Sequence, residues 1–420
     1  MCTHNSLKAP ESRTYLPVIW RFLLTAIFFY CLFTIYAVFK TPVWGWDIDA
    51  TCPCLTAIQD HENPYSSDYV QRHYQTHLSC TYQPATYYML LLPCKLLTYG
   101  KVASIGLLWI GGLLLLYKLI NNVFVFATIM LGAFSGFPFY LLTGNLGASL
   151  EFFLLCLFIN FFHRQKYLFA TFLLSTFGFV KIIPLLVLIP YLWFLKKELK
   201  MNLSRHLFAV VGTLVVLFGV SALSGWRLFL DHFKLLLGGV PGQLSPINDI
   251  SFGWSNPTLL LFFRGLAEGM PGVTLYLVIV VIVLLAVRHV TYASTVPIIQ
   301  KLMFLLLALF LILPRTKPYF FISCAPLLYI ALIGISSRLR KIVLLGVALI
   351  YPLLAFNVVL DNGLTTPINA FFGGASIFSL GLTVVTMYFF LLGKSAIPGW
   401  LIERASKLPP LCLKRASEGR

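Results

Sequence analysis

The sequence predicts an all-α polytopic membrane protein, and its composition and the lengths of its apolar segments are the observations that predict it. Of the 420 residues, 59% are hydrophobic and 11% are charged, whereas a soluble globular chain carries about 25% charged residues. Apolar runs of roughly 17 to 25 residues, the length that a helix needs to span a membrane, recur from end to end. The alternating pattern typical of a membrane β-barrel is absent from the sequence.

These apolar runs predict about 11 to 13 membrane-spanning or re-entrant helices. The predicted ranges are 16–39, 86–98, 102–118, 122–142, 147–162, 167–180, 182–195, 207–224, 271–287, 296–313, 319–336, 342–360 and 371–393. The net charge of +17 does not indicate nucleic-acid binding, because the basic residues lie in short loops beside apolar runs, which is the signal of cytoplasmic loops. We expect one membrane domain over residues 1–395 and a basic cytoplasmic tail at 396–420.

The same charge rule places two long segments, about 40–84 and 225–270, on the outer face. For the crossings to alternate, the apolar segment 86–98 must enter the membrane and return on the same side. The stretch 167–195 has basic loops at both ends and is predicted to form two short helices that turn near Lys181. A charge at such a break marks a functional site in many membrane proteins.

Two acids, Asp47 and Asp49, directly follow the first apolar segment and therefore stand at the predicted outer boundary of the membrane. Acids are ordinary at the start of a solvated loop. The alternative is a general base poised where a lipid-borne substrate presents its head group. In an extended or irregular segment, two residues this close point in different directions, so we expect one of the two to do the chemistry.

Outer-face cations and polar loop residues supply further candidates. Six basic residues oppose the positive-inside bias: Lys181, Arg227, Lys234, Arg264, Arg315 and Lys317. Arg and Lys bind phosphate, and contact with anionic lipid head groups is the alternative. We favour phosphate binding for Lys181 and Arg315. The tyrosine- and proline-rich segments at 62–69 and 80–88 indicate either a turn and an aromatic belt or a loop fixed on the membrane.

The cysteines of the first outer segment, Cys52, Cys54 and Cys80, could form a disulfide if that segment faces an oxidising compartment. With His61, His73 and His77 they could also be interpreted as a metal cluster, but no spacing matches a zinc pattern, and we predict no metal site. A phosphate-binding loop, a dinucleotide fingerprint and a serine-hydrolase motif are absent from the sequence.

Taken in order, these segments resemble glycosyltransferase family 87, the polyprenol-phosphate-mannose-dependent α-1,2-mannosyltransferases of the GT-C superfamily. The resemblance covers about residues 15 to 335. It rests on Asp47 followed by Asn-Pro-Tyr at 63–65, a Tyr-x-Pro at 82–84, TGNLGASLEF at 143–152, GFVKIIPLLVLIPYL at 178–192, NDISFGWSNPTLLLFFRGL at 248–266 and LPRTKPYFFISCAPLL at 313–328. By position, Asp47 matches the family's catalytic acid, and Asp49 is the substitute.

The resemblance implies a GT-C fold and a sugar, such as mannose, moved from a polyprenyl-phosphate donor to a lipid or glycan acceptor. It implies inversion at the anomeric carbon, no cofactor, and a site on the periplasmic or extracytoplasmic face of a plasma membrane. The donor phosphate would bind Lys181, Arg264, Arg315 and Lys317, and the substrate loops would contribute Tyr65, Tyr82, Asn145 and Asn248. Membrane lipids are expected partners and nucleic acid is not.

Two other functions fit a chain with many spans. A transporter or lipid flippase would also use a broken helix pair, but it predicts charges near the middle of several spans, and Glu151 and Lys181 are the main candidates. A structural subunit whose outer segments bind a partner would leave Asp47 replaceable.

Overall fold

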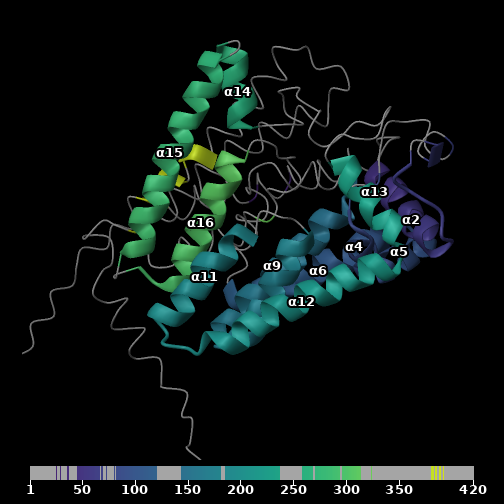
Figure 1. Cartoon of the computed structure of the whole chain (residues 1–420), viewed down its shortest axis with the longest axis horizontal. Coiled ribbons are helices and arrows are strands. Elements are labelled where there is room, and N and C mark those ends of the chain that lie inside the picture. The colour runs from purple at the N-terminus through teal and green to yellow at the C-terminus, as the bar shows by residue number, and fades with distance from the viewer. Residues whose placement is uncertain are drawn as a thin grey trace, which may run out of the picture.

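The computed structural model of the chain describes residues 45–66, 68–69, 72, 80, 82–120, 143–180, 185–236, 258–267, 270–293 and 296–313, with single positions at 25, 29, 36 and 323 and part of 380–391. These residues form helices, turns and loops, and no strand lies among them. Figure 1 shows two groups of helices that meet near α11 (Leu185–Lys197). The helical part of the predicted fold class is therefore confirmed.

The first group is a bundle of four helices. They are α6 (Lys101–Ile120), α9 (Leu146–His163), α10 (Tyr167–Val180) and α12 (Leu203–Leu223). The central helix is α9, which packs between α6 and α10, while α12 lies on the other side of α10. The central position of α9 agrees with its burial, since 72% of its membrane-length stretch is buried inside the protein, against 17% for α12.

Short helices close one end of this bundle, which we name the cap end. They are α2 (Trp46–Gln59), α4 (Pro84–Met89), α5 (Leu91–Leu96), the 3-10 turn η1 (Leu97–Tyr99) and α13 (Trp226–Leu236). The backbone N–H of Ala85 donates to Ser221 Oγ at 3.1 Å and so ties α4 to the last turn of α12. The two six-residue helices α4 and α5 agree with the prediction that 86–98 turns back instead of crossing.

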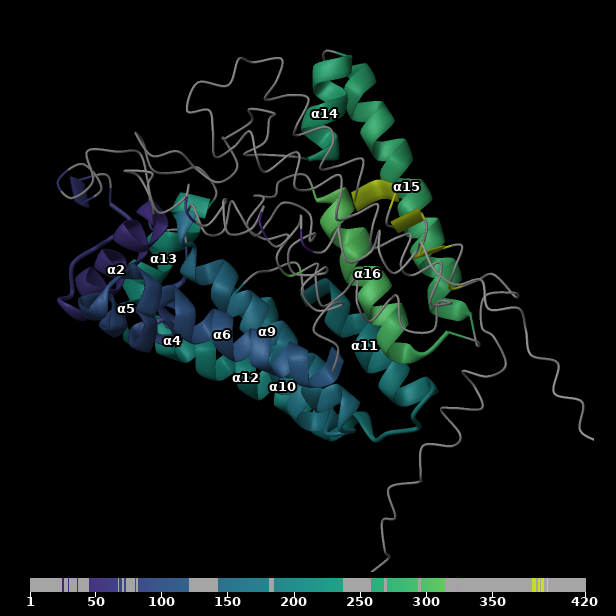
Figure 2. The same ribbon diagram turned by 180° about the vertical axis from the view of Figure 1, so that it is seen from behind.

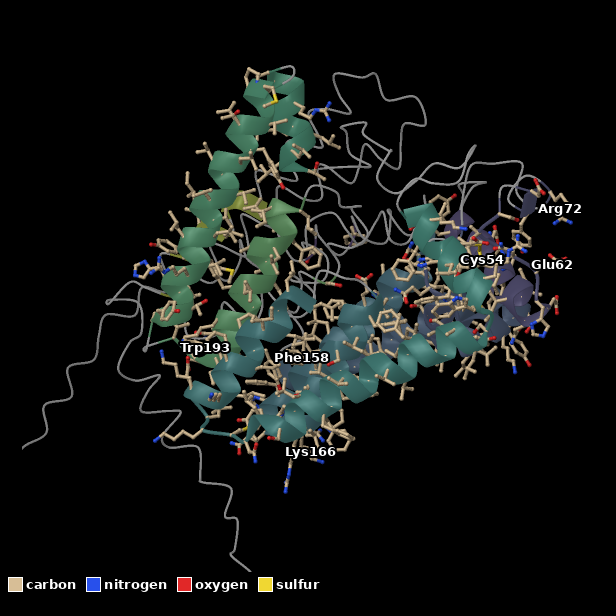
Figure 3. The ribbon with its side chains drawn as sticks, in the orientation of Figure 1. Cys54, Glu62, Arg72, Phe158, Lys166 and Trp193 are labelled. Carbon is tan, nitrogen blue, oxygen red and sulfur yellow. A yellow bond between two sulfur atoms is a disulfide. The ribbon has the colours of Figure 1, made fainter. Side chains whose placement is uncertain are left out.

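The opposite end, which we name the basic end, collects cations from several loops. Arg164, Lys166, Lys196, Lys197, Lys200 and Arg205 lie there and are exposed. Figure 3 shows Lys166 and Trp193 at this end and Cys54, Glu62 and Arg72 at the cap end. The Tyr191 hydroxyl donates to the carbonyl of Tyr167 at 3.0 Å, so α10 and α11 run in opposite directions. This confirms the predicted helix pair over 167–195.

The second group consists of α14 (Leu259–Leu266), α15 (Met270–Tyr292) and α16 (Ile298–Ile312). It joins the bundle through α11, which packs on α16, and Figure 2 shows the same arrangement from behind. The ammonium of Lys301 in the first turn of α16 binds Glu198, beyond the end of α11, at 2.6 Å. The basic end therefore includes the start of α16.

Four of the described helices are long and apolar enough to cross a membrane, namely α6, α9, α12 and α15. Each agrees with a predicted span, as do the shorter helices α10 and α16. The predicted spans 16–39, 122–142, 319–336, 342–360 and 371–393 lie wholly or largely outside the described residues, as does the tail at 396–420. The segment after α12 begins with the amphipathic helix α13.

Candidate functional site

Asp47 stands at the cap end, in the first turn of α2, where the start of α9 meets it. The amide nitrogen of Asn145 donates to Asp47 Oδ2 at 2.7 Å. Asn145 is buried and Asp47 is half-buried. The side chain of Asp47 is thus held by a residue from another helix, 98 positions along the chain, at the boundary between the bundle and the cap.

Asn145 can hold Asp47 because its amide group has a fixed orientation. Its Oδ1 accepts from the backbone N–H of Ala148 at 2.6 Å and caps α9, which is the usual role of asparagine before a helix. The Tyr82 hydroxyl donates to the same Oδ1 at 3.2 Å. With Oδ1 acting as acceptor for both, Nδ2 is left as the group that points to Asp47.

A glycine makes room for this arrangement. Any Cβ at Gly147 would overlap the hydroxyl end of the Tyr82 ring. Gly147 therefore lets Tyr82 reach Asn145 across the first turn of α9. This glycine belongs to the TGNLGASLEF segment, and the sequence alone gives no reason for it.

Asp49 lies on the opposite side of α2, where it forms an ion pair with Lys101 at 2.5 Å. The prediction of an extended or irregular segment here is wrong, because both acids lie in the first turn of a helix, where carboxylates interact well with the helix dipole. The two side chains still point in different directions, since residues two positions apart on a helix are rotated by about 200°. The charge of Lys101 at the cap end is thereby matched by a carboxylate.

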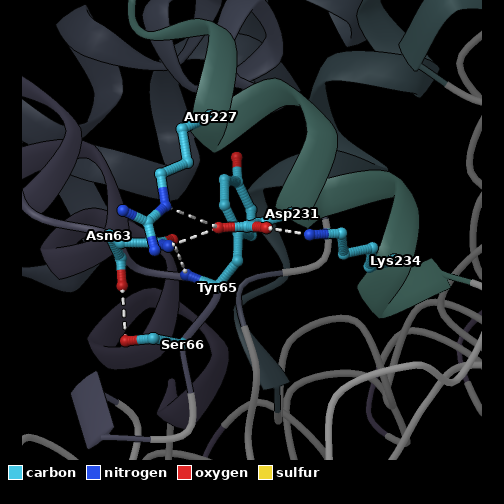
Figure 4. A network of polar contacts seen from close by, with 6 residues as sticks. All are labelled: Asn63, Tyr65, Ser66, Arg227, Asp231 and Lys234. Atoms are coloured by element: carbon cyan, nitrogen blue, oxygen red, sulfur yellow. Dashed lines mark hydrogen bonds and ion pairs between the residues drawn. The ribbon is translucent and has the colours of Figure 1, made fainter.

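Tyr65 and Asn63 of the Asn-Pro-Tyr turn connect the cap helices. The Tyr65 hydroxyl donates to the carbonyl of Tyr82 at 2.9 Å. Burial, with a contribution from Tyr87, raises the pKa of the Tyr65 phenol well above its ordinary value, so the hydroxyl stays protonated and able to donate. Asn63 Nδ2 donates to Asp231 Oδ2 on α13 at 2.8 Å, and Figure 4 shows this network. The two predicted outer segments therefore meet at this turn.

Two disulfides fasten α2 to its neighbours. Cys52 is bonded to Cys94 of α5, and Cys54 is bonded to Cys80 just before α4. The possibility of a disulfide in this segment is confirmed, while Cys94 is a partner that the sequence interpretation missed. An even set of four cysteines between 52 and 94 was the available signal. Because three cysteines of the alternative metal cluster are in disulfides, they cannot serve as thiolate ligands.

Beside the Cys52–Cys94 disulfide lies a cavity of about 690 Å³ between α2 and α5. Its lining combines apolar groups with hydroxyl, amide and charged groups, among them Thr56, Gln59, Asp60, Glu62, Lys95 and Thr98. A volume of this size suits a small organic ligand. The cavity lies on the side of α2 that carries Asp49, so Asp47 faces away from it.

Of the predicted phosphate-binding residues, the structure describes only Arg264, and this residue does not lie beside Asp47. Arg264 is exposed near the end of α14, and Figure 1 and Figure 2 both draw α14 apart from α2. Lys181, Arg315, Lys317 and Asn248 lie outside the described residues. What the structure does assemble is Asp47, Asn145, Tyr82 and Tyr65, from four separate places in the sequence.

Comparisons of the chain with protein-family models, with curated proteins and with solved structures find no match. The membrane character stated above comes from the helices themselves. The resemblance to glycosyltransferase family 87 remains a prediction that rests on the sequence motifs.

Proposed function

We propose that this protein is an integral membrane glycosyltransferase that moves a sugar from a polyprenyl-phosphate donor to an acceptor hydroxyl, with Asp47 as general base. The observation that supports the proposal is the placement of Asp47. It is a half-buried carboxylate at the end of a membrane bundle, held by the buried amide of Asn145 at 2.7 Å. Such a carboxylate stands where a substrate anchored in the bilayer presents its head group.

The choice between the two acids follows from their partners. The charge of Asp49 is offset by the ammonium of Lys101, and its side chain is 56% exposed. Asp47 receives an N–H from the amide of Asn145, at the start of α9. A general base must be held within hydrogen-bond reach of its substrate, and the rigid start of α9 supplies that support for Asp47. We therefore assign the base to Asp47 and a structural ion pair to Asp49.

In the proposed reaction the carboxylate of Asp47 takes the proton of the acceptor hydroxyl while that oxygen attacks the anomeric carbon. The bond between this carbon and the phosphate oxygen breaks, and the polyprenyl phosphate leaves with the electron pair. Attack from the opposite side inverts the configuration, so a β-linked donor gives an α-linked product. Arg264 lies on α14, apart from Asp47, so Lys181, Arg315 and Lys317 are the cations proposed for the leaving phosphate, whose stabilisation would contribute most of the rate enhancement.

We place the cap end on the extracytoplasmic side of the membrane. Disulfides persist in oxidising compartments, and both described disulfides lie at this end. The cations of the opposite end agree with the rule that cytoplasmic loops are rich in Lys and Arg. The acceptor would be a lipid or glycan on the outer surface, and the lipid chain of the donor would remain in the bilayer.

The test is sugar transfer from radiolabelled polyprenyl-phosphate-mannose in membranes that contain wild type, Asp47→Asn or Asp49→Asn at equal expression. We expect Asp47→Asn to lower the rate by roughly 10²–10⁴-fold, the usual contribution of a general base. Asp49→Asn keeps most of the activity. If only Asp49→Asn is inactive, the base moves by two residues. If both variants are fully active, the proposal fails.

Transport of a lipid or solute is the second function, and the buried carboxylate of Glu151 in α9 is the observation that favours it. Buried acids within spans often line substrate or proton pathways. Glu151→Gln separates the two functions: it would abolish transport, whereas a transferase with Asp47 as base would retain an intact acid at the cap end and continue to transfer sugar.

A further inference from the structure

The amphipathic helix α13 has two faces with different surroundings. Leu228, His232 and Leu235 are buried against the cap. The other side exposes Trp226 and Leu230 together with two cations, Arg227 and Lys234, whose side chains are 93% and 66% exposed. An exposed edge that alternates apolar and basic side chains is typical of helices that lie at a membrane surface.

The length of α12 places this edge relative to the bilayer. Its 21 residues extend about 31 Å, which is close to the thickness of the hydrocarbon core. Gly225, at φ +146°, turns the chain directly from α12 into α13. The first residue of α13 therefore emerges where the hydrocarbon ends, and no linker exists that could carry α13 farther into water.

Exposed apolar side chains also continue from one helix to the next. Phe208, Val215 and Leu223 are exposed along α12, and Trp226 and Leu230 follow on α13. Aromatic contacts tie the two helices together, since Phe218 of α12 packs edge-on against Phe229 with ring centroids 5.9 Å apart. The side of the bundle that faces lipid is thereby extended to α13.

The two cations are held beside each other by an acid beneath them. Asp231 Oδ1 accepts from Lys234 Nζ at 3.1 Å, and its Oδ2 lies 4.0 Å from Arg227 Nε (Figure 4). Asp231 is only 18% exposed, and its Oδ2 also accepts the hydrogen bond from Asn63. The carboxylate thus faces the cap while the guanidinium and the ammonium face outward, which leaves a positive outer surface.

We infer that α13 lies in the lipid headgroup layer and that Arg227 and Lys234 bind the phosphates of anionic phospholipids. Trp226 and Leu230 insert at the boundary, as tryptophan does at membrane interfaces. Through Asp231 and Asn63, this lipid contact reaches the Asn-Pro-Tyr turn. The inference is independent of glycosyl transfer, because it requires only that the bundle spans a membrane.

Native mass spectrometry of the full chain in detergent, titrated with phosphatidylglycerol, tests the lipid contact. Arg227→Gln/Lys234→Gln is expected to weaken binding roughly 30-fold, since each of the two cations contributes about fivefold near an anionic surface. The control is Arg72→Gln/Lys95→Gln, which also removes two positive charges from the cap end but leaves α13 unchanged. This variant should change binding less than twofold. Equal losses in the two variants would overturn the inference.

Competition identifies the source of the phosphate. Phosphatidylcholine and sodium phosphate should not displace phosphatidylglycerol from the wild type. If farnesyl phosphate displaces it at equal concentration, while phosphatidylglycerol cannot displace farnesyl phosphate, the cations belong to a prenyl phosphate and the phospholipid assignment is wrong.

The depth of α13 is measured separately, by fluorescence quenching of the chain in liposomes. The difference between wild type and Trp226→Phe isolates one of the eight tryptophans. We expect that difference signal to be quenched most by lipids with bromine on the upper acyl carbons. Quenching by aqueous acrylamide alone would place α13 in water and overturn the inference.

Discussion

The two ends of the helix bundle each begin a membrane span with an asparagine, and the comparison separates a site from a scaffold. At the basic end Asn202 caps α12 by accepting from the N–H of Ser204 at 2.9 Å, and it is exposed. At the cap end Asn145 caps α9 in the same way but is buried and also donates to Asp47. The same residue in the same capping role thus gains a second task only where the tertiary structure brings an acid to it.

The two ends are also held together by different means. The cap end is fastened by two disulfides and by side-chain hydrogen bonds among Asp47, Asn145, Tyr82 and Tyr65. The basic end relies on the ion pair between the buried Lys301 and the more exposed Glu198, and on hydroxyl contacts such as that of Tyr191.

The largest effect is expected at the basic end. Glu198→Ala removes the partner of Lys301, which is 3% exposed, and a buried charge without its partner costs about 3–5 kcal/mol of unfolding free energy. Unfolding in mixed detergent and dodecyl sulfate measures the loss. The double variant Glu198→Ala/Lys301→Met should recover much of it. A double variant as unstable as the single one would contradict an ion-pair role.

Removing a disulfide at the cap end should have the next largest effect. Cys52→Ser/Cys94→Ser opens a link across 42 residues and is expected to lower the unfolding free energy by about 2–4 kcal/mol. Treatment of the wild type with a reductant should cause at least this loss, because it also opens the Cys54–Cys80 bond, while Glu198→Ala remains sensitive to the same treatment. Resistance of the wild type to reduction under unfolding conditions would show that this bond is absent.

The two asparagine caps allow a direct comparison. Asn202→Ala loses a cap and should cost about 0.5–1 kcal/mol. Asn145→Ala loses a cap and the contacts to Asp47 and Tyr82, so we expect about 1–2 kcal/mol and a fall in transfer activity that Asn202→Ala does not show. Thermal unfolding and the transfer assay measure these differences. Equal behaviour of the two variants would remove the special role of Asn145.

The smallest change in stability is expected for Gly147→Ala. Alanine favours the helix by about 1 kcal/mol, which offsets the displacement of the Tyr82 ring. The unfolding free energy should therefore change little, whereas the bond from Tyr82 to Asn145 is lost. Activity should fall as far as it does in Tyr82→Phe, and the double variant Gly147→Ala/Tyr82→Phe should fall no further. Additive losses would mean that the two residues act separately.

Much of the helix pattern could be predicted from the sequence, because each span is a local property of apolar composition. The ranges of α6, α9, α10, α12, α15 and α16 were close to those expected. The start of α2 was predicted as extended or irregular, because the apolar periodicity that marks a helix is weak in a segment with two acids, a proline and two cysteines. The pairing of Cys52 with Cys94 could not be predicted, since spacing does not determine disulfide partners.

The helical, membrane-length character of this chain follows from its amino-acid sequence, because bilayer thickness translates directly into segment length. The sequence also pointed to Asp47, Tyr65, Tyr82 and Asn145 as candidates. Which of these residues meet could be learned only from the folded chain, because the hydrogen bond between Asn145 and Asp47, 98 residues apart, depends on how α2 packs against α9. The folded chain also distinguishes the two neighbouring acids. Both lie in the first turn of α2, but Asp47 contacts Asn145 and Asp49 contacts Lys101.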